Sequence, residues 1–219
     1  MKSNRQVLGE HPSIFSQVLS EVRDCEIQSD RLRFRRNLER LGEIFAFEIS
    51  KQLAFEVTNV TTPLGVAACH RLREQPVLAT ILRAGLPLHQ GLLNYFDHAD
   101  NAFISAYRKH EGDDDSFEVE IEYLSSPKLD DRVVILCDPM LATGSSMVLA
   151  YKALLKLGTP REIHVVSVIA SEQGVQFVEN ELPPGTRLWL GAVDAELTSR
   201  AYIMPGLGDA GDLAYGAKE

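Results

Sequence analysis

The segment Val133–Ser146 combines an apolar run, an acid and a cluster of small hydroxyl residues. The apolar run has the composition of a strand buried on both faces, and Asp138 follows it directly. Open α/β sheets bind ligands at this end of their strands. A helix is predicted to begin at Thr143, and the unpaired N–H groups of a first helical turn bind phosphate. The spacing predicts a phosphate site beside an acid. The alternative is that Thr143 and Ser145 only cap the helix.

A second candidate anion site follows the strand-like run Pro76–Leu82. Arg83 stands at the end of this run, and residues 84 and 85 are small. A guanidinium there can form two parallel hydrogen bonds to phosphate, and small neighbours let an anion approach the backbone closely. The alternative is a surface arginine beside a helix start. Arg108 and Lys109 end another predicted strand and would add a third basic point at the same edge.

The third segment, Tyr202–Asp212, is a glycine-rich loop entered through a proline and carrying two acids. Glycines 206, 208 and 211 match the spacing of the dinucleotide-binding fingerprint. That motif also needs a following helix, a further strand and an acid about 20 residues on, whereas the sequence has only eight residues after Gly211. We therefore reject the match. The loop is predicted to fold over a ligand and present backbone groups to it, and the alternative is a flexible tail.

Histidines and cysteines form no site pattern. The six histidines lack metal-ligand spacing, and no Gly-x-Ser-x-Gly elbow is present. Cys25, Cys69 and Cys137 lie far apart without a Cys-x-x-Cys motif, which indicates reduced thiols in a reducing compartment. Cys137 lies in the apolar run and is expected to be an inert buried thiol. We expect a cytoplasmic protein with no metal site built from its own side chains.

The elements that position these segments alternate between strand and helix. The opening third is expected to be helical, with a cap at Ser29-Asp30. Strands are expected at 76–82, 101–107, 132–138, 163–170 and 187–194, and helices at 143–157 and 171–182. This order predicts an α/β fold, a mainly parallel sheet flanked by helices, in one domain over residues 1–219. The alternation around a polar turn at 107–126 predicts a projecting β-hairpin arm.

Composition and charge exclude several classes. The chain has 219 residues, 45% hydrophobic and 24% charged, with a formal net charge of −9. Seven acids and no base lie in Glu111–Glu122, so the rest of the chain is nearly neutral. A general nucleic-acid coat protein is disfavoured, because non-specific affinity comes from Lys and Arg. No signal-peptide core and no run of about 20 apolar residues is present, so we expect no membrane association.

With these segments in view, the chain resembles the uracil branch of the type I phosphoribosyltransferases over nearly its whole length. The resemblance rests on the segments His11-Pro12, ILRAGL (81–86), Tyr107-Arg108, DPMLATGSS (138–146) and YIMPGLGDAGD (202–212). The last segment is the most specific, since other type I transferases share the phosphate loop and recognise their bases with different hoods. The resemblance implies a type I phosphoribosyltransferase-like fold with the arm at about 107–126 and a C-terminal, uracil-binding hood loop at about 195–219.

The resemblance implies conversion of uracil and phosphoribosyl pyrophosphate (PRPP) to UMP and diphosphate. Arg83 and Arg108 would hold the pyrophosphate, and Asp138 would face the ribose or a magnesium-bound water. The implied catalytic residues are Asp138, Arg83, Arg108 and Asp209. The implied PRPP-binding residues are Arg83, Arg108, Asp138, Pro139, Met140, Leu141, Ala142, Thr143, Gly144, Ser145, Ser146 and Asp209. The implied uracil-binding residues, which act through the backbone, are Ile203, Gly208, Asp209 and Ala210.

The resemblance also implies Mg²⁺ held mainly by PRPP and water, a homodimer or larger homo-oligomer, and GTP as an activator. Ser145 stands where the family usually has glycine, so its φ must stay negative. Two rival functions remain open. One is a transferase for another base, and the other is a pyrimidine-sensing regulator on the same fold that binds RNA. The dense arginine cluster between Arg31 and Arg40 would have to serve that regulator, although we expect it to be a solvated or dimer-contact face.

Overall fold

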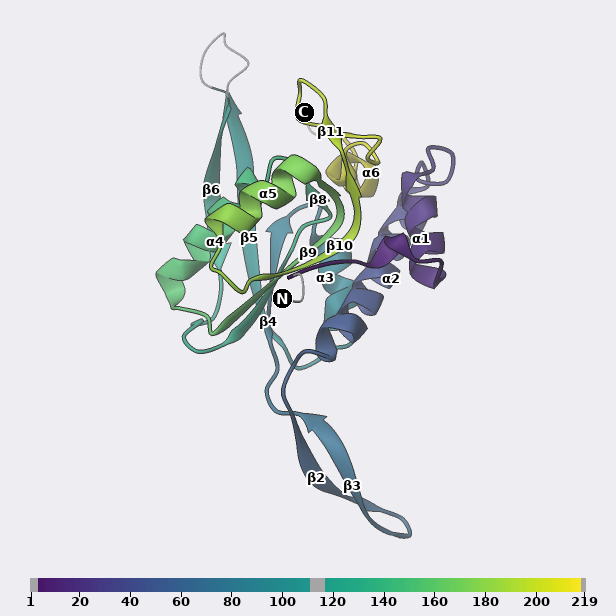
Figure 1. Ribbon diagram of the computed structural model, residues 1–219, viewed down its shortest axis with the longest axis vertical. Coiled ribbons are helices and arrows are strands. Elements are labelled where there is room, and N and C mark those ends of the chain that lie inside the picture. The colour runs from purple at the N-terminus through teal and green to yellow at the C-terminus, as the bar shows by residue number, and fades with distance from the viewer. Residues whose placement is uncertain (1–3, 111–116, 218–219) are drawn as a thin grey trace.

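The computed structural model describes residues 4–110 and 117–217, without the side chains of residues 106–110 and 117–120. Its centre is a mainly parallel sheet with helices on both faces (Figure 1). The strands lie in the order β1 (Arg5–Val7), β10 (Arg187–Asp194), β9 (Glu162–Ser171), β7 (Val133–Cys137), β4 (Val77–Leu82), β5 (Asp100–His110) and β6 (Phe117–Ser125). The short β8 (Met140–Leu141) pairs with β9, and only the pair of β5 and β6 is antiparallel among these described strands. The predicted α/β class is confirmed.

Two groups of helices cover the two faces of the sheet (Figure 1). On one face lie α1 (Ile14–Arg23), α2 (Arg31–Ser50) and α3 (Leu86–Leu93), and on the other lie α4 (Ser145–Leu154) and α5 (Glu172–Glu181). Side chains alternate between the faces of a strand. Leu78 of β4 therefore packs with the first group, and its neighbour Ala79 packs with the second. Among the described residues, no helix combines the length and apolar character that crossing a bilayer requires.

The caps that the sequence indicates are present. Asp30 accepts hydrogen bonds from the N–H groups of Leu32 (2.9 Å) and Arg33 (3.1 Å), so the predicted start of α2 is confirmed. A short 3₁₀ turn, Leu155–Leu157, follows α4, and this helical segment ends at Gly158, whose φ is 134°. A positive φ of this size is a backbone conformation that glycine adopts readily and other residues rarely do. The predicted helix end is therefore confirmed.

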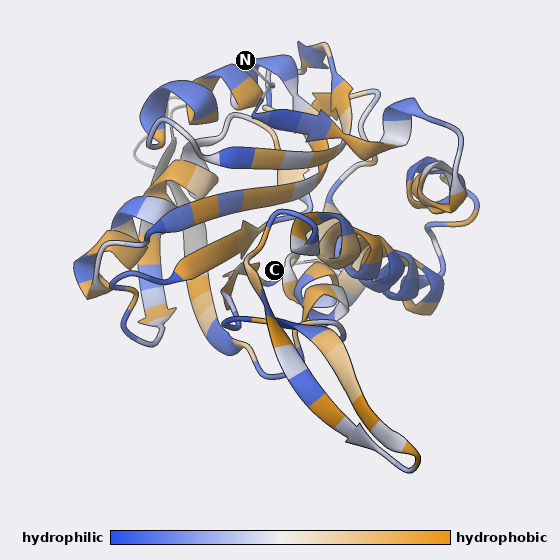
Figure 2. Cartoon of the chain, turned by 60° about the horizontal axis from the view of Figure 1, so that its bottom comes forward, coloured by the Kyte–Doolittle hydropathy of each residue, from blue (hydrophilic) through white to orange (hydrophobic). Residues whose placement is uncertain are grey.

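The arm hairpin is formed as predicted, with β5 and β6 paired antiparallel from Phe103 to His110 and a register shift after Ser105. The expectation of a helical opening third is wrong at Arg5–Val7, which forms β1 of the main sheet, and at residues 55–72. There β2 (Phe55–Thr62) and β3 (Gly65–Leu72) form a second hairpin that projects from the body (Figure 1). Apolar residues recur along it while most of its residues stay exposed (Figure 2). Because neither face of this hairpin is buried, its sequence lacks the regular alternation of apolar and polar residues that predicts a strand.

Candidate functional site

The predicted phosphate loop, residues 138–146, begins where β7 ends. The Asp138 N–H donates to the Val166 carbonyl of β9 (3.1 Å), and the Pro139 carbonyl accepts from the N–H groups of Val168 (3.1 Å) and Ile169 (3.0 Å). The Met140 N–H donates to Asp138 Oδ1 (3.3 Å). The loop therefore continues the sheet toward β9. The structure brings the predicted residues Asp138 to Ser146 together at the carboxyl end of the strands, beside the first turn of α4.

Gly144 forms the tight corner of the phosphate loop. It precedes α4 with φ 82°, and a Cβ there would lie 2.9 Å from Phe177 Cδ1 and 3.0 Å from the Gly174 carbonyl oxygen. Ser145 is the first residue of α4, and it is not one of the described residues with a positive φ. The expectation of a negative φ at Ser145 is therefore confirmed. The helix accepts serine at 145 because Gly144 takes the left-handed conformation instead.

The junction between β9 and α5 contacts the loop through hydrogen bonds that the sequence does not predict. Ser171 Oγ donates to the Ala142 carbonyl (2.5 Å) and accepts from the Gly174 N–H (2.8 Å). A Cβ on Gly174 would lie 2.3 Å from the same Ala142 oxygen. Ser171 ends β9 and is the N-cap of α5, and a serine at the junction of a strand and a helix is a local signal for a cap. Its contact with a loop about thirty residues away depends on the packing of α5.

Asp138 has an unusual electrostatic position. Burial, with a contribution from the Asp209 carboxylate, raises its pKa to about 7, against the opposing hydrogen bond from the Met140 N–H. The negative charge of Asp209 therefore contributes to the electrostatic environment of Asp138. A carboxyl group with this pKa exchanges its proton near neutral pH, which is common at functional sites.

Replacing Asp138 with asparagine should stabilise the protein at alkaline pH. Because the folded pKa of about 7 lies above the ordinary 3.8, the folded state retains a proton that the unfolded state releases between these values. Stability is therefore lost as the pH rises through that window. We expect Asp138→Asn to have a higher melting temperature than the parent protein at about pH 8, with the difference shrinking toward about pH 4. A difference that does not change with pH would contradict the raised pKa.

Arg83 links the end of β4 to the C-terminal helix α6 (Ala210–Tyr215). Its Nη2 donates to Asp212 Oδ1 (3.0 Å) and to the Gly216 carbonyl (2.7 Å). Its Nε is buried and has no hydrogen-bond partner within the described residues. The Leu82–Arg83 peptide bond is cis. The predicted basic residue thus lies at the carboxyl edge of the sheet with donor capacity left for an anion.

The C-terminal segment is packed rather than a loose tail. We call the described residues 195–217 the hood. Two short strands, β11 (Glu196–Leu197) and β12 (Ile203–Met204), pair in the hood before the glycine-rich loop. Asp209 then caps α6 by accepting from the N–H groups of Gly211 (2.8 Å) and Asp212 (3.0 Å). Arg35 of α2 donates to the Ala214 carbonyl (2.7 Å). The fully buried Ala214 fixes α6 on the body of the protein.

The four predicted uracil-binding residues lie in the hood in two environments. Ile203 and Ala210 are buried, whereas Gly208, with φ 94°, and Asp209 are exposed. Arg108 lies in β5 opposite Val119, but its side chain is outside the described part, as are the acids at 111–115. Only the backbone position of Arg108 is therefore placed.

The sheet order, the phosphate loop and the hood define a type I phosphoribosyltransferase fold. An orotate phosphoribosyltransferase of Mycobacterium tuberculosis, solved with PRPP, has a similar fold with a TM-score of 0.51 over 86% of this chain and 95% of that chain, at 14% identity. A solved structure from Aquifex aeolicus is more similar, with a TM-score of 0.85 and 30% identity over 97% of this chain and 98% of that one.

The sequence comparisons identify the branch. The family model described as uracil phosphoribosyltransferase matches residues 8–217. A uracil phosphoribosyltransferase of Porphyromonas gingivalis is 56% identical over 211 residues, covering 96% of this chain and 97% of that protein. One from Pyrococcus furiosus is 36% identical over 205 residues, covering 91% and 85%. The chain belongs to the uracil phosphoribosyltransferase family.

Proposed function

We propose that this protein is a uracil phosphoribosyltransferase that converts uracil and PRPP to UMP and diphosphate in pyrimidine salvage. The observation that carries the proposal is that residues 138–146 and the hood meet at one edge of the sheet. There burial, with a smaller contribution from Asp209 of the hood, raises the pKa of Asp138. Membership of the family, with a relative at 56% identity, supports the same reaction. The whole chain acts as one catalytic domain in this proposal.

In the reaction, uracil loses its N1 proton to water, and the resulting N1 anion displaces diphosphate from C1′ of PRPP through an oxocarbenium-like ribose. Residues Ala142–Ser146 hold the 5′-phosphate on backbone N–H groups and the dipole of α4. Arg83 and Arg108 stabilise the charge that grows on the leaving diphosphate. Backbone groups at Ile203 and residues 208–210 orient uracil and favour its anion, while the hood excludes water. No side chain is assigned as a general base.

Magnesium is part of the proposal, with the ion held mainly by PRPP oxygens and water. Within residues 4–110 and 117–217, no three His, Cys, Asp or Glu side chains form a group that could hold a metal. Mg²⁺ commonly uses one or two carboxylates together with substrate phosphates, and the carboxylates of Asp138, after β7, and Asp209, at the start of α6, fit that donor set. When bound, the ion neutralises diphosphate charge.

Purified protein with uracil, PRPP and magnesium should release UMP. The rival function, transfer to another base, is tested by competition among uracil, orotate, hypoxanthine and xanthine. We expect uracil to be turned over preferentially. Turnover of another base in preference to uracil would refute the assignment of the hood, and no product from any base would refute the enzymatic function.

The RNA-binding regulator is disfavoured by how the arginine cluster is used. Arg33 makes two hydrogen bonds to Glu21 (2.9 and 2.8 Å), and Arg36 pairs with Glu39 (2.7 Å). These arginines are partnered within the chain, so this face offers less unpaired positive charge to RNA phosphates. A salt-dependent shift on titration with RNA would favour the regulator instead.

Replacing Arg108 with alanine should raise the KM for PRPP about tenfold and change the KM for uracil little, since a charge-assisted hydrogen bond is worth about 1.5–3 kcal/mol. The reason is that Arg108 is proposed to contact only the diphosphate. Initial rates at varied concentrations of each substrate give both constants. Equal changes in the two KM values would remove Arg108 from this role.

A homodimer or larger homo-oligomer is proposed, and the β2–β3 hairpin supports it. Phe55, Val57 and Val66 are between 47% and 69% exposed, and Leu64 is fully exposed. An isolated two-stranded hairpin is marginally stable in water, so a second copy is expected to cover it. Sedimentation equilibrium should show Val57→Glu shifting the protein toward monomer. A parent protein that is already monomeric at micromolar concentration would contradict the proposal.

Activation by GTP and a cytoplasmic location complete the proposal. The family resemblance supports GTP as an activator, which a GTP titration of the initial rate tests. The unpaired thiols of Cys25, Cys69 and Cys137 support the cytoplasmic location. Cys137 is buried, and burial raises its pKa to about 12, as expected for an inert thiol.

A further inference from the structure

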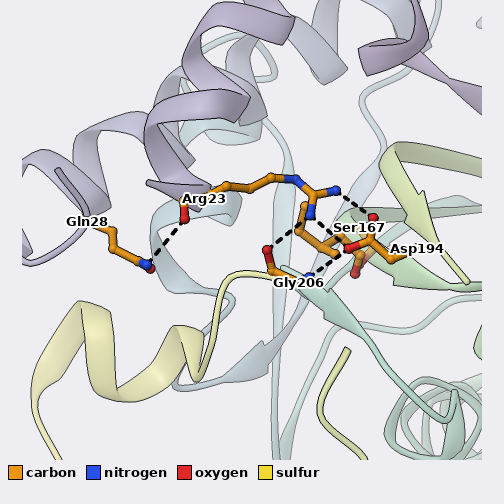
Figure 3. Close-up of polar contacts among 6 residues, drawn as sticks. Arg23, Gln28, Ser167, Asp194 and Gly206 are labelled. Carbon is orange, nitrogen blue, oxygen red and sulfur yellow. Dashed lines mark hydrogen bonds and ion pairs between the residues drawn. The ribbon is translucent and has the colours of Figure 1, made fainter. Parts of the chain in front are cut away.

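A partly buried ion pair holds the turn at Gly206, within the hood (Figure 3). Arg23, the last residue of α1, donates from Nη1 and Nη2 to the two carboxylate oxygens of Asp194, both at 2.8 Å. Asp194 is the last residue of β10. Arg23 Nη1 also donates to the Gly206 carbonyl (3.0 Å), and the Gly206 N–H donates to Asp194 Oδ2 (2.9 Å). Both backbone polar groups of Gly206 are therefore bound by the same pair, which we call the clamp.

The clamp is partly shielded from water, more so at Asp194 than at Arg23. Asp194 is 9% exposed and the Arg23 side chain 24%. Burial favours a higher pKa for Asp194, but the hydrogen bonds from Arg23 and Gly206 and the charge of Arg23 outweigh it, so the pKa lies below its ordinary value. A charged, two-pronged pair of this kind fixes both distance and orientation. Losing one partner leaves the other charge buried and unpaired.

The turn held by the clamp has little freedom of its own. Gly206 has φ 56°, and a Cβ at this position would lie 2.1 Å from the Ile203 carbonyl oxygen. The chain therefore folds back so that Gly206 packs directly against the backbone of Ile203. A displacement of Gly206 toward Ile203 would therefore push on Ile203, which is itself buried in the core.

We propose that Arg23 and Asp194 are positioning residues that set the uracil-binding backbone of the hood. The inference rests on the proposed function, in which Ile203 lies just before the clamped glycine and residues 208–210 follow it. Recognition through main-chain groups tolerates displacements of only about 0.5 Å. The clamp supplies that accuracy from two elements, α1 and β10, that lie outside the hood.

The effect of the clamp should be selective for one substrate. The far end of the hood is held separately, because Asp212 and Gly216 of that end bind Arg83. The phosphate loop is held by β9 and Ser171. Within the described residues, the side chains of Arg23 and Asp194 form their hydrogen bonds with each other and with Gly206, and with neither of those segments. Loosening the clamp should therefore disturb uracil binding and leave PRPP binding intact.

The test compares both KM values in Asp194→Asn and Arg23→Lys. Asparagine at position 194 keeps an acceptor for the Gly206 N–H but has no negative charge. Lysine at position 23 keeps the positive charge but cannot donate two parallel hydrogen bonds to the Asp194 carboxylate. We expect the KM for uracil to rise about tenfold in each variant while the KM for PRPP changes less than about twofold, as for a small displacement of a binding group. Circular dichroism and a melting curve establish that each variant is folded.

Glu21→Gln is the matched control, because Glu21 lies on the same helix α1 as Arg23 and forms an equally two-pronged pair with Arg33 of α2. Its only other hydrogen-bond partner among the described residues is Asn37 of α2, so the change weakens a pair between α1 and α2 without touching the hood. We expect both of its KM values to equal those of the parent protein. Folded clamp variants with unchanged KM values, or with equal changes for the two substrates, overturn the inference while the parent protein still makes UMP. A parent protein that makes no UMP overturns the proposed function and the inference with it.

Discussion

Replacing Gly144 with alanine should raise the KM for PRPP about 100-fold. The backbone there has φ 82°, where an L-residue costs about 1–2 kcal/mol. The new Cβ would also lie 2.9 Å from Phe177 Cδ1, 3.0 Å from the Gly174 carbonyl oxygen and 3.1 Å from Val178 Cγ2. Inserting a methyl group into a well-packed site costs a further 1–3 kcal/mol, roughly, in free energy. If the loop holds the 5′-phosphate as proposed, a shift of the loop that relieves both costs also moves its N–H groups away from the phosphate, and each loss of about 1.4 kcal/mol is tenfold in affinity.

Gly185→Ala separates this effect from the general cost of a left-handed alanine. Gly185 has φ 103° in the turn before β10, and a Cβ added there would meet no atom within 4 Å beyond its chain neighbours. We expect it to lower the melting temperature without changing either KM. Steady-state kinetics on the two variants make the comparison, and a Gly144→Ala enzyme with the parent KM for PRPP would show that the loop does not hold the phosphate.

The parts of the site that lie within one local segment can be predicted from the sequence. The run before Asp138 is apolar enough for a buried strand, and the hydroxyl residues after it indicate a helix start, so their order alone places an acid beside a helix N-terminus. The predicted bounds of the strand Arg187–Asp194 equal the observed ones, because Pro183-Pro184-Gly185 marks where it can begin. Local signals of this kind do not depend on the rest of the fold.

The contacts that fix the site cannot be predicted in this way, because they join residues far apart in the chain. Arg83 and Asp212 are 129 positions apart, and Arg23 and Asp194 are 171 positions apart. Each residue by itself has the pattern of an ordinary exposed charge. Their pairing follows from the packing of α6 and α1 against the strand ends, which a single sequence does not specify. The β2–β3 hairpin escapes prediction for a related reason, since it buries no face within the described chain.

Replacing Arg83 with alanine should lower kcat/KM for PRPP about 10²- to 10³-fold, the usual cost of removing one donor aimed at developing charge. Arg83 stands at the strand end, with Nε buried and without a partner among the described residues. Its Nη2 is held by Asp212 and Gly216, so the guanidinium is oriented before substrate arrives. Arg83→Lys should recover only part of the loss, because an ammonium cannot form the two-pronged contact.

Asp212→Asn distinguishes the two consequences of losing Arg83. Alanine at 83 removes both the diphosphate contact and the ion pair that anchors α6, whereas asparagine at 212 weakens only the anchor. If Arg83 binds diphosphate, Asp212→Asn keeps kcat/KM for PRPP within a few-fold of the parent enzyme and raises mainly the KM for uracil. If Asp212→Asn instead reproduces the full loss, Arg83 acts by holding the hood, and the charge on the leaving group must be met elsewhere. The partly exposed pair makes the first result the expected one, because an ion pair of this kind contributes about 1 kcal/mol or less.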